Sequence, residues 1–215
     1  MLIIPELQKV VIMPPRSGST ALKEAILNTY EHAYSPYRHG EWDMLVYIAD
    51  KEPRVRLWDV VYMLRNPMER MISLWNYMQD VSPERNPKAP QEWIDRVKSD
   101  ASVPFGWWLR TSTELFNESR TSPIDKSPRS YYCTYYQVAA ARKDARYFLG
   151  GMRGLHNKGQ LHVLNVNDEH KYMPLLGINR PDRLNESTKR EATWDTEEQR
   201  HIKEHFHTDL ILETL

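Results

Sequence analysis

The segment VVIMPPRSGST, residues 10–20, decides how the chain begins to fold. Residues 10–13 form a short apolar run rich in β-branched side chains, which predicts a buried strand. Pro14 and Pro15 then end the strand at a sharp turn. The sequence ALKEAILNTYEHAY follows with helical spacing, and Ser19 or Thr20 is available as the N-cap. The segment therefore predicts a strand, a tight loop and a helix in succession.

The loop at the centre of this segment has the composition of an anion-binding site. Small residues let backbone N–H groups approach an anion, and the N-terminus of the following helix favours negative charge. The loop supplies a cation, a glycine and three hydroxyl groups, from Arg16, Gly18, Ser17, Ser19 and Thr20. It is not a Walker A motif, because that motif needs a second glycine and a lysine. An ordinary capped helix start after a turn is the alternative interpretation.

A second strand, turn and helix repeat this pattern further along the chain. Residues 57–64 predict a buried strand, residues 65–67 a turn and residues 68–77 a helix. Two such units in succession imply a parallel sheet. Arg65 stands at the carboxyl end of the strand and Ser73 about two turns into the helix, so the pair is placed to hold a second phosphate. Alternatively, Arg65 caps a neighbouring carbonyl and Ser73 is a small packing residue.

The rest of the chain carries weaker signals. Residues 81–130 are rich in proline, serine and asparagine, which predicts either a loop-rich insertion that carries function or a merely solvated connection. The other predicted elements are helical pieces such as residues 90–97, a helix at 131–145, a strand at 160–166, a helix from Asp168 to a C-cap at Gly177, and a terminal helix from residue 196 that packs on the sheet.

Length and composition limit the classes of function. The chain has 215 residues, with 29 basic and 29 acidic side chains, so its formal net charge is zero. This length fits one compact domain spanning residues 1–215, and the balanced charge gives no sign of a nucleic-acid partner. A lone cysteine, Cys133, excludes an internal disulfide and a cysteine zinc site. No stretch approaches the roughly 18 apolar residues of a membrane span, and no basic leader opens the chain, so a soluble cytoplasmic protein is expected.

The two loops together resemble a known pair of motifs. PRSGST, residues 15–20, and LRNPMERMIS, residues 64–73, are similar to the 5′-phosphosulfate loop and the 3′-phosphate motif, RDPxxRxxS, of sulfotransferases that use 3′-phosphoadenosine 5′-phosphosulfate (PAPS). The second segment matches this pattern at Arg65, Pro67, Arg70 and Ser73, whereas Asn66 replaces the usual aspartate. A weaker likeness continues in HVLNVNDEHKYMPLLGI, residues 162–178. The similarity covers roughly the first 80 and the last 55 residues.

The resemblance implies a fold, a reaction and a set of contacts. The fold is an α/β domain, P-loop-like and three-layered, with a central parallel sheet flanked by helices and residues 81–130 on the acceptor side. The reaction moves a sulfuryl group from PAPS to a hydroxyl of a glycan or glycoconjugate, without a metal, and leaves 3′,5′-ADP. Residues 16–20 are implied to contact the 5′-phosphosulfate, while Arg65 and Ser73 contact the 3′-phosphate.

Two residues are candidates for the general base that removes the acceptor proton. In sulfotransferases similar to the uronosyl 2-O enzymes, a Gly-His pair at about this distance before the RDP motif supplies a catalytic histidine. Here Gly40 is followed by Glu41, and His39 stands before it. Glu41 is preferred by position, whereas the ordinary pKa of His39 suits a base at neutral pH. Arg16 is the candidate for stabilising charge on the transferring group. Alternatively, His39 only holds the loop and Glu41 pairs with Arg38.

Two other functions remain open at the level of sequence. One is a non-catalytic protein that binds PAPS or 3′,5′-ADP after losing its base, which the glutamate at position 41 makes credible. The other is a P-loop-type small-molecule kinase, disfavoured by the missing Walker lysine and the lack of an evident Walker B aspartate. The histidines at 201, 205 and 207 have the spacing of metal ligands, but a polar helix face is the favoured interpretation. The sequence does not predict the oligomeric state.

Overall fold

The computed structural model describes residues 1–36, 48–87, 89–110, 145, 149, 160–179 and 188–214. The chain divides into two compact units. The first unit consists of Met1–Asn66, Lys143–Asn185 and Phe206–Leu215, and the second of Pro67–Arg142 and Glu186–His205. The single domain expected from length remains a prediction.

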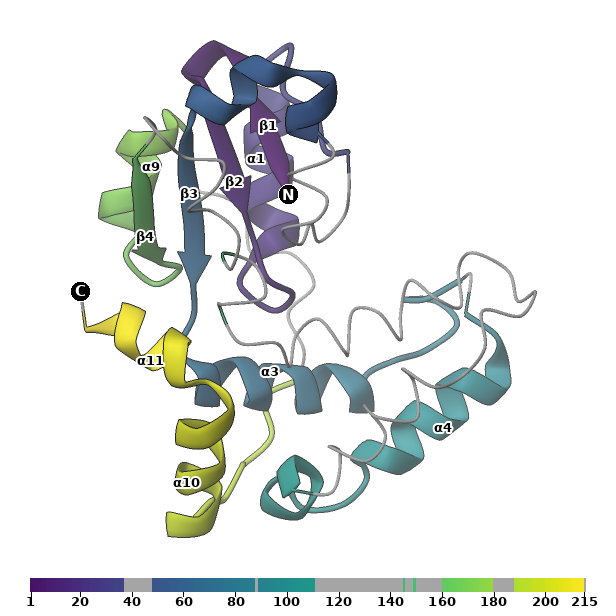
Figure 1. Cartoon of the computed structure of the whole chain (residues 1–215). Helices are drawn as coiled ribbons and strands as arrows, with labels where there is room; N and C mark the ends of the chain where they lie inside the picture. The colour runs from purple at the N-terminus through teal and green to yellow at the C-terminus, as the bar shows by residue number, and fades with distance from the viewer. Residues whose placement is uncertain are drawn as a thin grey trace. The chain divides into compact units, whose positions relative to one another are not determined.

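A four-stranded sheet forms the centre of the first unit, in the order β1-β2-β3-β4 (Figure 1). Its strands are β1 (Leu2–Ile4), β2 (Lys9–Ile12), β3 (Asp59–Leu64) and β4 (Leu161–Asn165). The pairs β2–β3 and β3–β4 are parallel, as predicted, and β1 is antiparallel to β2. The sheet is therefore open and mostly parallel.

The first strand was not predicted from the sequence. β1 and β2 are separated only by the short 3₁₀ helix η1 (Pro5–Leu7) and Gln8, whose φ of 52° lies in the left-handed region. This tight return lets β1 pair with β2. On the other side of β1, the N–H of Ile3 donates to the carbonyl of Tyr34 at 2.9 Å. All three residues of β1 are buried, so the apolar N-terminal stretch is part of the core.

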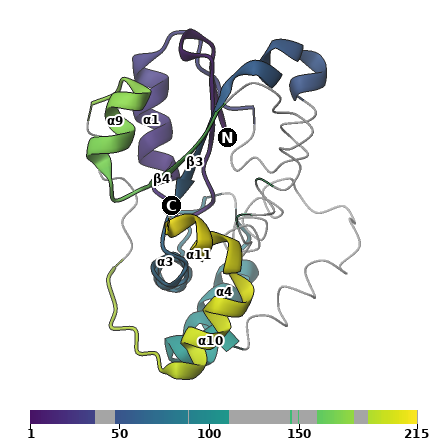
Figure 2. The same cartoon turned by 60° about the vertical axis from the view of Figure 1, so that its left-hand side comes forward.

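Helices cover one face of this sheet. They are α1 (Ser19–Thr29) and α9 (Glu169–Leu176), which lie side by side in Figure 2. Leu22 and Ile26 of α1 share a hydrophobic cluster with Tyr172 and Leu176 of α9 and with Val11 of β2. The pair fixes the position of α1, whose N-terminus follows the loop after β2.

The opposite face of the sheet is also covered. The strand residues Val10, Ile12 and Tyr62 form a second cluster with Val55 and Leu212. Val55 lies in the 3₁₀ helix η2 (Pro53–Leu57), and Leu212 in the C-terminal helix α11 (His207–Glu213). Side chains alternate between the two clusters along β2, and both faces are covered, which explains the continuous apolar run in its sequence.

Gly177 ends α9, as predicted, and the structure gives two reasons for a glycine there. Its φ is 57°, and the N–H groups of Gly177 and Ile178 donate to carbonyls of the last turn, at Pro174 and Met173. In addition, a Cβ at this position would lie 2.4 Å from the hydroxyl oxygen of Tyr30. That hydroxyl donates to the Leu176 carbonyl at 2.7 Å, so Tyr30 cannot move away without losing this hydrogen bond.

The predicted terminal helix is wrong as a single element. The structure has α10 (Thr196–His205) followed by α11, with Phe206 between them at φ −122°. Phe206 is buried, and the buried carboxylate of Asp209 accepts a hydrogen bond from the Ala145 N–H at 2.8 Å. α11 packs on β3 in the first unit, whereas α10 belongs to the second unit and packs on α3. Only α11 therefore fulfils the prediction of a helix on the sheet.

The second unit is built from α3 (Pro67–Gln79), α4 (Gln91–Ala101) and α10. The predicted helical piece at residues 90–97 is part of α4, which is longer than expected. Four large aromatic side chains form much of the core of this unit: Trp75, Trp93, Phe105 and Trp108. The Trp75 and Phe105 rings meet edge to face, with centroids 5.8 Å apart. These aromatic residues therefore build the core of the second unit.

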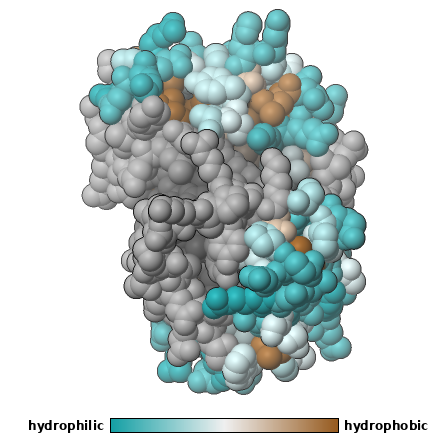
Figure 3. Space-filling model, turned by 90° about the vertical axis from the view of Figure 1, so that its right-hand side faces the viewer, coloured by the Kyte–Doolittle hydropathy of each residue, from teal (hydrophilic) through white to brown (hydrophobic). Residues whose placement is uncertain are grey.

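On one face of the molecule, the described residues carry little contiguous apolar area (Figure 3). On the face shown in Figure 3, hydrophobic side chains form small separate spots among hydrophilic ones. Such scattered apolar residues are ordinary on protein surfaces. Among the residues that the structure describes, no helix is both long enough and apolar enough to cross a bilayer.

Candidate functional site

The loop after β2 is fixed by hydrogen bonds to a single carbonyl. The backbone N–H of Ser17 donates to the Pro14 oxygen at 3.2 Å, and the Ser17 hydroxyl donates to the same oxygen at 2.5 Å. Ser17 is only 1% exposed. Both donors of Ser17 therefore point into the loop, and this residue shapes the turn instead of presenting its hydroxyl proton to a ligand.

The backbone of this loop alternates between left-handed and ordinary conformations. Arg16 has a φ of 69° and Gly18 a φ of 70°, whereas Ser17 between them has no positive φ. Alternation of this kind turns successive N–H groups toward a common concave side, which is the geometry of backbone anion sites. The conformation of Arg16 is strained, since the left-handed region costs a residue other than glycine roughly 1–2 kcal/mol. Strain of this kind clusters at functional sites.

Gly18 is the N-cap of α1, so the predicted cap at Ser19 or Thr20 is wrong. α1 begins at Ser19, and no side chain among the described residues caps its first turn. A Cβ at Gly18 would meet no atom within 4 Å, so its positive φ, not crowding, favours a glycine there. Ser19 is half-buried and Thr20 is exposed. The start of α1 thus places backbone N–H groups and two hydroxyl groups next to Arg16.

Arg65 reaches this loop from the neighbouring strand. Its Nη1 donates to the backbone carbonyl of Arg16 at 2.8 Å, across 49 residues of sequence. Ile12 at the end of β2 pairs with Tyr62 of β3, and because the two strands are parallel, their carboxyl ends meet at one edge of the sheet. The structure therefore brings Arg65 together with the 14–20 loop inside the first unit. It also shows Arg65 capping a neighbouring carbonyl, the alternative interpretation of the sequence.

Asn66 has a partner that explains the departure from the RDP pattern. Its side-chain amide nitrogen donates to both carboxylate oxygens of Glu213 in α11, at 3.1 and 3.0 Å. An aspartate at position 66 would place a second carboxylate against Glu213, and like charges at this distance repel. The asparagine instead connects the turn after β3 to α11. This partner lies 147 residues away in sequence, so no local motif indicates it.

The other predicted site residues lie outside the described residues of the first unit. Ser73 is half-buried on α3, and Arg70 on the same helix is fully buried, but both belong to the second unit. The 3′-phosphate role of Ser73 stays a prediction. Both base candidates, His39 and Glu41, lie outside the described residues.

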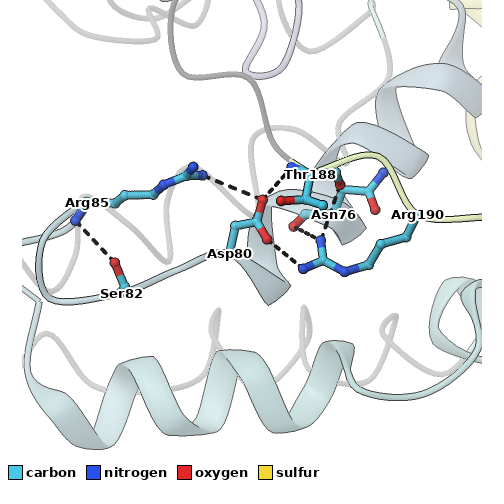
Figure 4. A network of polar contacts seen from close by, with 6 residues as sticks. All are labelled: Asn76, Asp80, Ser82, Arg85, Thr188 and Arg190. Carbon is cyan, nitrogen blue, oxygen red and sulfur yellow. Dashed lines mark hydrogen bonds and ion pairs between the residues drawn. The ribbon is translucent and has the colours of Figure 1, made fainter.

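A polar network in the second unit centres on Asp80, just after α3 (Figure 4). Its carboxylate lies between two guanidinium groups, accepting from Arg190 Nη2 at 2.6 Å and pairing with Arg85 Nη1 at 3.5 Å. It also accepts from the backbone N–H of Thr188 at 2.6 Å. Arg190 donates in addition to the Asn76 carbonyl at 3.4 Å. These hydrogen bonds attach the segment at 188–190 to the end of α3, and Arg190 donates two of them.

The network lowers the pKa of Asp80 below its ordinary value of 3.8. Burial, which leaves its side chain 8% exposed, would raise the pKa, but the hydrogen bonds from Arg190 and Thr188 outweigh this effect. A carboxyl group whose pKa is lowered by folding stabilises the native state above its unfolded pKa. This contribution is lost as the pH falls from about 3.8 through the lower pKa of the folded state.

Replacing Asp80 by Asn should therefore destabilise the chain at neutral pH by about 1–3 kcal/mol, the scale of hydrogen bonds that involve a charged group. The measurement is urea unfolding of both proteins from pH 7 to pH 3. The difference in unfolding free energy should shrink below pH 3.8, where the wild-type carboxylate takes up its proton. Asp95→Asn on the exposed surface of α4 is the control, because Asp95 lies outside the Asp80 network and accepts a hydrogen bond from its neighbour Gln91 on the same helix. A difference that is constant with pH would contradict this account of Asp80.

A cluster of acidic side chains at Asp195, Glu197 and Glu198 has a structural explanation. The N–H of Glu197 donates to Asp195, and the N–H of Asp195 donates to the Glu198 carboxylate, which is a reciprocal cap at the start of α10. Arg110 pairs with both Glu197 and Glu198. The cluster thus caps a helix and binds a cation of the chain itself.

Comparisons of this chain with protein-family models, curated proteins and solved structures found no match. A function for the 14–20 loop and Arg65 therefore rests on the chemistry and geometry of these residues. The loop offers backbone N–H groups and a half-buried arginine, and a second arginine lies at hydrogen-bonding distance from it. Such an arrangement is suited to a ligand with more than one anionic group.

Proposed function

We propose that the chain is a sulfotransferase that moves a sulfuryl group from PAPS to a hydroxyl of a glycan or glycoconjugate. The observation that supports this most strongly is the 2.8 Å contact between Arg65 Nη1 and the Arg16 carbonyl. It joins the two turns that resemble the two phosphate motifs of PAPS-dependent sulfotransferases. Had they lain apart, one doubly phosphorylated adenosine would have had no common site.

The proposed contacts follow from the position of each group. The N–H groups at the start of α1 and the side chain of Arg16 bind the 5′-phosphosulfate, with Ser19 and Thr20 as hydroxyl donors. Ser17 keeps the loop in shape, since its own donors bind Pro14. Arg65 binds the 3′-phosphate, the role that its likeness to the second motif assigns to it. On this proposal the first unit is a P-loop-like, three-layer α/β fold.

The proposed reaction is an in-line displacement at sulfur. The acceptor oxygen forms a bond to sulfur while the bond from sulfur to the 5′-phosphate oxygen breaks, and 3′,5′-ADP leaves with the electron pair. A base takes the proton of the acceptor hydroxyl, which is the role assigned to Glu41 or His39. Arg16 stabilises the charge that develops on the transferring group and on the departing phosphate. Backbone N–H dipoles and the arginine cation supply the electropositive environment that the scheme needs.

We expect 3′,5′-ADP to raise the melting temperature of the chain and ATP to leave it nearly unchanged. A ligand that binds only the folded state at about a hundred times its Kd stabilises it by about 2.7 kcal/mol. For a chain of this size that corresponds to a rise of roughly 5 °C or more. The measurement is a thermal melt with each nucleotide, with adenosine as the uncharged control. Stabilisation by ATP and not by 3′,5′-ADP would favour the kinase alternative.

Nucleotide binding alone does not separate an enzyme from a binding protein. Transfer of labelled sulfate from PAPS to a panel of glycan acceptors provides that distinction. Label in any acceptor would support the sulfotransferase. Binding of 3′,5′-ADP without transfer to any acceptor of the panel would favour a non-catalytic nucleotide-binding protein.

A further inference from the structure

Arg65 contacts the loop through the backbone, and this contact has a consequence for the whole anion site. The hydrogen bond runs from Nη1 to the carbonyl oxygen of Arg16, the residue with the left-handed φ of 69°. We propose that Arg65 is a positioning residue that holds the 14–20 loop in its anion-binding conformation. It thereby couples the two phosphate subsites, an effect on ligands that rests on the proposed function.

The peptide unit between Arg16 and Ser17 is held at both of its polar ends. Because a peptide is planar, the Arg16 carbonyl and the Ser17 N–H belong to one rigid group. The carbonyl accepts from Arg65 at 2.8 Å, and the N–H donates to Pro14 at 3.2 Å. A rotation of this peptide would break both hydrogen bonds at once. The orientation of this unit determines where the next N–H groups, at Gly18 and Ser19, point.

The same unit carries the strained residue, so it needs external support. A left-handed arginine is disfavoured by roughly 1–2 kcal/mol, and conformations of this kind persist only where surrounding contacts hold them. The hydrogen bond from Arg65 is charge-assisted, which makes it one of the stronger kinds. Arg65 directly follows β3, a strand buried along nearly its whole length, so the donor is attached to the centre of the sheet.

A guanidinium group can serve the loop and a phosphate together. It carries five N–H donors in one plane, so one edge can hold the Arg16 carbonyl while another faces the 3′-phosphate. A lysine ammonium is a compact point charge and lacks this fork. The two subsites thus share one side chain, and loss of Arg65 should weaken even a ligand that has no 3′-phosphate.

The first test uses the protein without nucleotide, so that it does not depend on the proposed function. Hydrogen exchange at the Ser17 amide should accelerate about tenfold in Arg65→Ala, since a charge-assisted hydrogen bond contributes on this scale. Amides within β2 should exchange as before. Arg56→Ala is the matched control, because Arg56 makes an exposed ion pair with Asp50 in the same unit. Unchanged exchange at Ser17 in Arg65→Ala would overturn the positioning role.

The second test measures the Kd of 3′,5′-ADP and of adenosine 5′-phosphosulfate, which lacks the 3′ group. In Arg65→Ala both should weaken about tenfold or more, and 3′,5′-ADP more than adenosine 5′-phosphosulfate. Arg65→Lys should weaken the binding of each nucleotide less than Arg65→Ala does. It serves as the informative variant if Arg65→Ala does not fold. If Arg65→Ala weakened the binding of 3′,5′-ADP alone, the coupling of the two phosphate subsites would be overturned, but the nucleotide site itself would stand. Faster exchange in a protein that binds neither nucleotide would refute the proposed function and leave the positioning role standing.

Discussion

On the proposed function, replacing Arg16 by Asn is expected to lower sulfuryl-transfer turnover by a factor of about 10² to 10³, the usual cost of removing one donor that stabilises transition-state charge. Arg16 is the cation of the loop that Arg65 and Pro14 hold in place. Its side chain is assigned to charge that develops during transfer, so kcat should fall more than KM for PAPS rises. Initial rates with labelled PAPS at saturating acceptor measure this effect.

The choice of asparagine separates the loss of a cation from the loss of loop geometry. Residue 16 has a φ of 69°, and asparagine adopts this conformation more readily than most other residues. Arg16→Gly tests the same point, since glycine accepts this φ without a steric penalty. Both variants should lose turnover to a similar extent and still melt near the wild-type temperature. An Arg16→Asn protein with normal turnover would remove Arg16 from the reaction.

The strand–loop–helix units were predictable because their signals are local. An apolar run followed by two prolines and Gly18 marks the end of β2 and the start of α1 within eleven residues of sequence. Pro67 marks the start of α3 in the same way. The helix cap at Gly18 was missed because the serine and threonine beside it are also common caps. Only the backbone conformation distinguishes these candidates.

Features that depend on distant partners were not predictable from one sequence. Asp80 and Arg190 meet across 110 residues, and no spacing rule relates them. The division of the C-terminal segment at Phe206 follows from the packing of α10 and α11 on different elements, because the apolar pattern itself continues through it. Arg65 is intermediate between these cases. The motif pair predicted that its turn and the first loop meet, but not that its donor binds the backbone of Arg16.

Replacing Glu41 by Gln is expected to reduce turnover about a hundredfold or more, the scale of losing a general base, while binding of 3′,5′-ADP stays intact. His39→Gln is the paired variant, because these two residues flank Gly40 and are the two candidates for the role. If Glu41 is the base, His39→Gln should keep most of its turnover. Labelled transfer and nucleotide Kd are measured for both proteins.

The pH dependence of kcat/KM, measured in the wild-type protein and in Glu41→Gln, distinguishes the two bases. A general base works only when deprotonated, so the rate falls as the pH drops through its pKa. An unperturbed imidazole has a pKa of about 6.5 and an unperturbed glutamic acid one of about 4.3. A base with the ordinary carboxyl pKa therefore gives a rate that is level from pH 8 to about pH 5, whereas a base with the ordinary imidazole pKa gives a tenfold fall for each pH unit below about 6.5. A fall near pH 6.5 that persists in Glu41→Gln, together with normal turnover in that variant, would transfer the role to His39.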